Sequence, residues 1–152
     1  MSPRTLFRTF AFAELVTWAG LIVGMILKYV TQTTDAVVPI AGGIHGFVFL
    51  CYVVVTVLVW IDGRWRPATG LLGLGSAVIP FATFPFEKIV DRRGLLAEHW
   101  RLAAPDAEVR GPLERLVSLV LRHPVIAALI AVALVAVAFT VLLILGPPVP
   151  RS

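Results

Sequence analysis

Two ionisable residues, Glu14 and His45, each lie inside a long apolar stretch of the sequence. His45 is in the segment GGIHGFVFLCY at positions 42–52. A lone ionisable group in hydrocarbon is costly unless it faces a protein interior or a wet cavity, and both side chains can carry a proton. We therefore expect either a proton or ion relay or a substrate site, or else a hydrogen bond that locks two helices together.

The depths of the two residues indicate that they meet. Glu14 lies about 12 Å into the first apolar block at 1.5 Å per residue, and His45 lies about 12 Å into the second, which runs the opposite way. Across a hydrocarbon core of about 30 Å, the two side chains should lie within roughly 6 Å of each other along the membrane normal.

The elements that position this pair are predicted from composition. Of the 152 residues, 59% are hydrophobic and only 14% are charged, which is too few polar residues for a soluble domain of this length. Blocks of roughly 20 apolar residues are long enough to cross a bilayer as helices. The sequence predicts an all-α membrane protein with four transmembrane helices, at Leu6–Leu27, Val37–Ile61, Ala68–Phe86 and Val125–Leu145.

We expect the chain to be divided into four parts. Residues 1–91 should form a three-helix membrane unit, 92–123 a polar linker, 124–146 the fourth transmembrane helix and 147–152 a disordered tail. Within the linker, one helical stripe favours an amphipathic helix on the membrane surface, although a backward extension of the fourth helix would explain it too. The stripe consists of Leu113, Leu116, Val117, Val120 and Leu121, and the residues off it are Glu114, Arg115, Ser118 and Arg122.

Charges near the ends of the blocks give conflicting signals about orientation. Arginines at the N-terminus and in the second loop favour a cytoplasmic N-terminus in a plasma or inner membrane. Cations at the far end of the third block (Lys88, Arg92, Arg93) would then lie outside. A third segment broken at Pro80 and Pro85, entering and leaving on one side, would remove this conflict.

Further polar and small residues are candidates for a site or for packing. Lys28 and Glu87 should lie at one membrane face and could pair, although Lys28 could instead extend to the headgroups. Tyr52 needs a hydroxyl partner if it is buried. Close helix packing is expected at two G-x-x-x-G pairs and at a proline in the third helix; these residues are Gly20, Gly24, Gly42, Gly46 and Pro80.

Several classes of function receive no support. Glu14 and His45 give only two ligands, so we expect no metal site, and we expect no cofactor; a haem between two copies through His45 is disfavoured. The sequence shows no phosphate loop, catalytic triad or nucleic-acid motif, so we predict a protein that is not an enzyme and binds no nucleic acid. Cys51 is the single cysteine, which excludes an intrachain disulfide.

Residues from about Leu6 to Asp91 resemble the DUF3817 family of small bacterial integral membrane proteins. The resemblance rests on Glu14 in the first block, LKY at positions 27–29, GGIHGFVF at 42–49 and IPFATFPFE at 79–87. The chain departs from the family pattern at Leu15-Val16 and at Ala82. The resemblance supplies no activity, but it implies that Glu14, Lys28, His45 and Pro80 are family positions.

Three hypotheses of function follow. The first is a homo-oligomeric channel or proton-coupled carrier that uses the Glu14–His45 pair. The second is an accessory or scaffolding subunit of a larger membrane complex. The third is lipid or quinone binding between helices, suggested by Phe81, Phe84 and Phe86. The lipid bilayer, other copies of the chain and membrane-complex subunits are the expected partners.

Overall fold

The computed structural model describes residues 1–123, 125–130, 133, 137 and 141, and within these residues the chain is helical and contains no strand. Two of its helices are long and apolar enough to cross a membrane, and a third apolar helix is shorter. The elements are α1 (Pro3–Met25), η1 (Ile26–Val30), α2 (Val37–Asp62), α3 (Pro67–Val78), α4 (Thr83–Arg92), η2 (Arg101–Ala103) and α5 (Gly111–Arg122).

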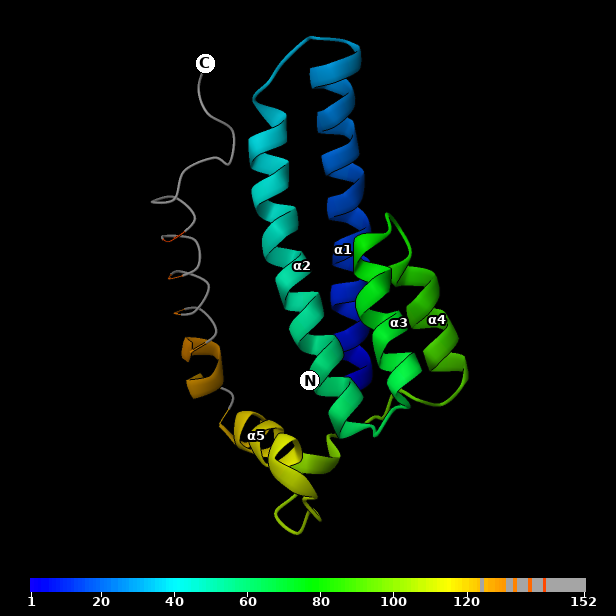
Figure 1. Ribbon diagram of the computed structural model, residues 1–152, viewed down its shortest axis with the longest axis vertical. Coiled ribbons are helices and arrows are strands. Elements are labelled where there is room, and N and C mark those ends of the chain that lie inside the picture. The colour runs from blue at the N-terminus through cyan, green and yellow to red at the C-terminus, as the bar shows by residue number, and fades with distance from the viewer. Residues whose placement is uncertain (124, 131–132, 134–136, 138–140, 142–152) are drawn as a thin grey trace.

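Helices α1 and α2 form a long antiparallel pair (Figure 1). Ser2 caps α1 by accepting the Thr5 N–H, and Pro3 occupies the first turn, where no amide donor is needed. The π-helical turn η1 extends α1 to 28 residues, about 42 Å. Near the connecting loop, a Cβ on Gly24 would lie 3.1 Å from Val37, so this glycine permits close approach of the two helices.

The prediction that Ala68–Phe86 forms a single transmembrane helix is wrong. Its residues form two short helices, α3 and α4, separated by a turn at Ile79–Ala82. Pro80 lacks an amide donor and Phe81 has φ 66°, so the helix cannot continue through the turn. With 12 residues, α3 is about 18 Å long, too short to cross a core of about 30 Å.

Helix α4 leads the chain back to the N-terminal end of α1. Thr83 at its start donates to the Ala11 carbonyl, and Glu87 one turn later pairs with Arg8 at 2.9 Å. The α3–α4 hairpin therefore enters and leaves at the same end of the α1–α2 pair (Figure 1). This arrangement corresponds to the alternative of a broken third segment, with the break at Ile79–Ala82 and with Pro85 inside α4.

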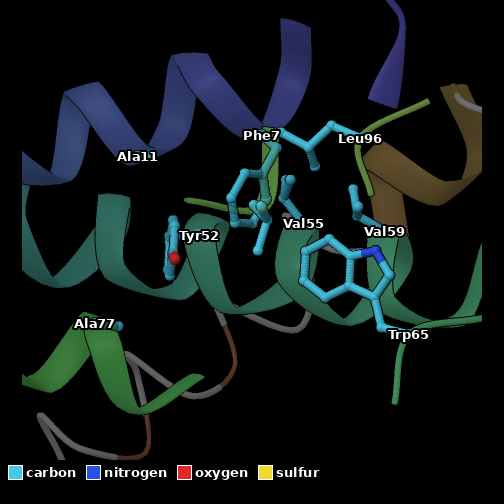
Figure 2. Packing of buried hydrophobic residues seen from close by; sticks show 9 residues of the cluster. Phe7, Ala11, Tyr52, Val55, Val59, Trp65, Ala77 and Leu96 are labelled. Atoms are coloured by element: carbon cyan, nitrogen blue, oxygen red, sulfur yellow. The ribbon is translucent and has the colours of Figure 1, made fainter. Parts of the chain in front are cut away.

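The apolar core lies where this hairpin covers α1 and α2. Figure 2 shows Phe7 and Ala11 of α1 facing Tyr52, Val55 and Val59 of α2. The core is completed by Trp65, Ala77, Val90 and Leu96. The other half of the α1–α2 pair is uncovered by described residues, and its Val23 and Ile40 are 53% and 65% exposed.

Ion pairs and hydrogen bonds join α1 to α4 and α2 to η2 at the end of the molecule that holds the N-terminus. Arg4 and Arg8 both contact Asp91 of α4. The Asp62 carboxylate at the end of α2 accepts the backbone N–H groups of Arg101 and Leu102, so it caps η2. These contacts hold the polar linker against the ends of the long helices.

Helix α5 confirms a helix in the linker but presents a different face from the predicted stripe. Glu114 and Ser118, expected off the apolar stripe, are buried because Glu114 pairs with Arg64 and Arg101, while Ser118 donates to the Leu102 carbonyl. Leu113 and Leu116, by contrast, are exposed. Most of the predicted fourth helix, 124–146, and the whole tail, 147–152, lie outside the described residues.

The expectation that Lys28 and Glu87 lie at the same face is also wrong, so the two do not pair. Lys28 lies on η1 at the loop end of the pair, where its Nζ is 5.4 Å from the centroid of the Tyr29 ring. Glu87 lies at the opposite end, with Arg8 and Lys88. The prediction assumed a third helix that crosses fully, which would have carried Glu87 to the far face.

Candidate functional site

Glu14 and His45 meet at the interface of α1 and α2, as predicted from their depths. Glu14 Oε2 lies 3.7 Å from His45 Nδ1. The Glu14 side chain is completely buried and that of His45 is 12% exposed. A distance of 3.7 Å is longer than a direct hydrogen bond, so a third group is needed to link the two side chains.

Thr17 supplies this link. Its hydroxyl oxygen lies 3.1 Å from His45 Nδ1 and 3.5 Å from Glu14 Oε2. It also lies 3.1 Å from the Glu14 backbone carbonyl. A hydroxyl can donate one hydrogen bond and accept others, so Thr17 can donate to a bare Nδ1 or accept from a protonated one.

Thr17 was not among the site residues predicted from the sequence. Its position three residues after Glu14 places both on one face of α1, and this spacing was the available signal. A threonine inside an apolar helix is otherwise typical of packing or of a bond to the preceding turn of backbone.

Aromatic rings fix the orientation of the imidazole. The Trp18 ring centroid lies 4.5 Å from that of His45, and the Phe49 ring lies 6.3 Å from it. Trp18 is itself held, because its indole N–H donates to the Ala77 carbonyl at 3.3 Å. The end of α3 thus supports the ring that packs against His45.

The tip of the α3–α4 hairpin reaches the level of Glu14. Ala11 bonds to the start of α4, and Trp18 bonds to the end of α3. Glu14 lies between these two residues on the same face of α1, three after one and four before the other. Its second oxygen, Oε1, is buried and has no hydrogen-bond partner among the described residues.

This environment determines what the pair can do chemically. A bare carboxylate without a full ion pair is costly away from water. The site therefore favours a proton on Glu14, or a cation beside it, or transfer of a proton between the carboxyl and imidazole through Thr17. No three His, Cys, Asp or Glu side chains among the described residues lie close enough together to hold a metal ion.

Tyr52 is buried and faces α3. Its hydroxyl lies 3.0 Å from Ser76 Oγ, and Ser76 donates to the Gly73 carbonyl at 2.7 Å. Because Ser76 has only one proton, Tyr52 donates to Ser76. Tyr52 and His45 are two helical turns apart on α2 and share a face. The Tyr52–Ser76 hydroxyl pair therefore lies two turns from the Glu14–His45 pair, towards the C-terminal end of α2.

The remaining candidates lie away from this pair. Lys28 and Glu87 occupy opposite ends of the molecule, as described above. Asp91 lies near Glu87, and the hydrogen bond from Arg4 holds the pKa of Asp91 below its usual value. Phe81 is at the hairpin tip, Phe84 packs against Phe12 and Phe86 packs against Phe7, so the three phenylalanines form no common surface.

The predicted packing glycines differ in their surroundings. Gly24 and Gly42 lie against the partner helix, where an added Cβ would meet Val37 and Leu21 respectively. An added Cβ on Gly20 or Gly46 would meet nothing within 4 Å among the described residues. At these two positions, close packing of a helix from another chain stays a prediction.

Comparison with known proteins shows similarity to a curated protein and to a family. The chain is 45% identical over 93 residues to "Putative membrane protein SCO5905" of Streptomyces coelicolor, a match covering 60% of this chain and 11% of the relative. This chain thus matches only a small part of that protein's length. No solved structure matches. The model of the family described as "Domain of unknown function (DUF3817)" matches residues 4–92, more than half of the chain. The chain therefore belongs to the DUF3817 family of proteins.

Proposed function

We propose that this protein works in proton- or ion-coupled transport across the cell membrane, as a homo-oligomer, with Glu14 and His45 as the proton-binding site. The observation that carries the proposal is the fully buried Glu14 carboxyl beside the His45 imidazole, with one oxygen that has no hydrogen-bond partner among the described residues. Intramembrane ionisable residues are a recurrent feature of proton relays and transport sites.

The position of the pair supports the proposal. Glu14 is 11 residues from the start of α1, about 16 Å along a helix that extends for about 42 Å with η1. A short hairpin reaches this level from one side, and at its tip the end of α3 and the start of α4 bond to α1 on either side of Glu14. Transport proteins commonly bind their substrates near the membrane midplane, where helices are interrupted.

The distribution of charge supports a multi-pass arrangement with the N-terminus in the cytoplasm. Except for Lys28, the lysines and arginines of residues 1–123 lie at the end of the molecule that holds the N-terminus (Figure 1). Cytoplasmic segments close to spanning helices are enriched in such residues. In this arrangement the α3–α4 hairpin opens to the cytoplasm.

A second copy would complete a pathway. The loop-end half of α1 and α2 is uncovered among the described residues, and Gly20 and Gly46 lie there with open space around them. Small residues let helices of neighbouring chains approach closely in lipid. We therefore place the transport pathway between copies of this chain.

The test uses purified protein in vesicles that contain a pH-sensitive dye, with an imposed ion or pH gradient. We expect wild-type protein to dissipate the gradient and Glu14→Gln to reduce the rate at least tenfold, because the amide cannot exchange a proton. Asp106→Asn is the matched control, since it removes an exposed carboxylate from the linker.

His45→Gln adds a second measurement. It should shift the pH dependence of the flux while leaving a residual rate, because Glu14 remains. Wild-type flux equal to that of empty vesicles, or equal flux in wild type and Glu14→Gln, would contradict the proposal. Thermal unfolding of each variant in detergent checks that it is folded.

A second candidate is a non-catalytic module of a larger membrane assembly. Its support is that this chain matches only 11% of its relative from Streptomyces coelicolor, so a unit of this kind occurs within a much longer membrane chain. Purification in mild detergent from the native membrane tests it. Stoichiometric recovery of another membrane protein would favour this candidate, whereas recovery of the chain alone would exclude it.

A further inference from the structure

The outer face of α5 carries a groove that the transport proposal does not use. The groove is shallow and open, with a volume of about 600 Å³. Two basic side chains, a histidine and two leucines supply most of its lining: Arg115, Leu116, Leu119, Arg122 and His123. These residues fall on one stripe of the helix, three or four positions apart. The groove thus combines cationic and apolar surface along a single helix face.

The acidic residue of α5 is turned away from this groove. Glu114 points inward, where it accepts hydrogen bonds from Arg64, Arg101 and the backbone of Arg110. Chiefly because of the bond from Arg64, the pKa of Glu114 is lowered to about 2. The sequence contains no aspartate or glutamate after Glu114, so the outer face of α5 has positive charge and no acidic neighbour along the helix.

The two arginines have donors available for an anion. Arg122 donates from one nitrogen to the carbonyls of Ala104 and Pro105, which positions its guanidinium at the end of α5. A guanidinium has five N–H donors and favours bidentate contacts to phosphate, so donors remain. Arg115 is exposed and makes no ion pair with a described residue.

The leucines place the groove at the boundary of the bilayer. Leu116 and Leu119 are 60% and 58% exposed, although α5 buries another face. The apolar helical residues 125–130 lie just beyond His123 in the sequence, and α5 itself lies at the end of α2 (Figure 1). An interfacial helix with arginines beside leucines matches the layer where phosphate groups meet acyl chains.

We propose that this groove binds the headgroup of an anionic phospholipid, with the phosphate held by Arg115 and Arg122 and the start of an acyl chain lying on Leu116 and Leu119. Charge complementarity selects an anionic headgroup over a zwitterionic one. This site is distinct from the Glu14–His45 pair and depends on the membrane placement of the chain but not on transport.

The test measures phospholipid retention by native mass spectrometry of full-length protein released from nanodiscs of defined composition. In mixtures of phosphatidylglycerol and phosphatidylcholine, wild-type protein should retain phosphatidylglycerol preferentially. The double variant Arg115→Gln/Arg122→Gln should weaken this retention on the order of tenfold or more. The matched control is Arg92→Gln/Arg93→Gln, which removes the same charge from the exposed end of α4.

The control and a competitor separate the outcomes. Equal losses of phosphatidylglycerol retention in the two double variants would mean that the lipid is attracted generally to the basic end of the protein. That result would overturn the proposal of a specific site. Displacement of the lipid by millimolar inorganic phosphate would overturn the role of the acyl chain. Arg115→Gln alone, at an exposed position, should show an intermediate loss with unchanged thermal unfolding, and full retention there would also count against the proposal.

Discussion

At the residue scale, the hydroxyl of Thr17 connects Glu14 to His45. It lies 3.1 Å from the imidazole nitrogen, while the carboxyl oxygen is 3.7 Å from the same atom. A direct contact and a hydroxyl-bridged contact differ chemically, because the bridge can pass a proton without the two rigid helices moving together. Removal of the Thr17 hydroxyl should therefore slow proton transfer between Glu14 and His45 more than it weakens the packing of α1 against α2.

One glycine in the hairpin tests the packing against α2. A Cβ on Gly70 would lie 2.0 Å from the Trp60 ring, so Gly70→Ala must displace an indole whose N–H bonds to the Trp65 carbonyl. We expect a loss of about 1–3 kcal/mol in the free energy of unfolding, measured by denaturant titration in mixed micelles.

The control for this substitution lies on the same helix. A Cβ on Gly75 would meet nothing within 4 Å, and alanine is the better helix former by roughly 0.5–1 kcal/mol. Gly75→Ala should therefore be neutral or stabilising. Equal destabilisation by the two substitutions would show that helix flexibility, and not contact with Trp60, sets the need for glycine.

The contact between Glu14 and His45 could be predicted from the rise per residue along each helix. That prediction required only two antiparallel helices joined by a short loop. The expectation that Lys28 and Glu87 share a face failed because it also required the third segment to cross. At this scale the sequence predicts contacts between neighbouring helices, and it predicts them poorly when an intervening turn is uncertain.

At the element scale, the residues of the α3–α4 hairpin do not by themselves distinguish a hairpin from a crossing helix. The run from Ala68 to Phe86 is apolar and long enough to cross, and a proline is tolerated in a kinked transmembrane helix. The return of the chain depends on distant contacts, chiefly Arg8 with Glu87 and Ala11 with Thr83. These contacts link residues more than 70 positions apart.

Cysteine labelling distinguishes a hairpin from a crossing helix. In a Cys51→Ala background, single cysteines at Arg66 and Arg93 should react with a membrane-impermeant maleimide from the same side, because the hairpin returns. A cysteine at Thr33, in the exposed loop between α1 and α2, should react from the opposite side. Reaction of position 93 together with position 33 would mean that the segment crosses.

The attachment of α5 should depend on pH through Glu114. Its pKa is about 2 in the folded chain and 4.5 without its partners. A lowered folded pKa adds stability that is complete above about 4.5 and is lost as the pH falls towards 2. Protection of the α5 amides against hydrogen exchange, relative to the intrinsic exchange rate at each pH, should therefore fall across this window. Glu114→Gln should remove this fall and lower the protection at neutral pH.

At the scale of the whole molecule, charge is concentrated at one end. Lys28 is the one lysine or arginine of residues 1–123 that lies at the loop end. Membrane topology usually follows such an imbalance. A fluorescent protein fused before Met1 should therefore be cytoplasmic and fluorescent, and alkaline phosphatase fused there should be inactive. An active phosphatase fusion would reverse the orientation.

The hairpin also gives the described part of the molecule unequal width. Near the N-terminal end α1 and α2 are accompanied by α3 and α4, whereas near the loop no other described helix lies against them (Figure 1). In a bilayer this shape displaces more lipid area from one leaflet than from the other. The protein should consequently act as a wedge that prefers strongly curved membrane, and it should accumulate on vesicles of small radius when offered a range of sizes.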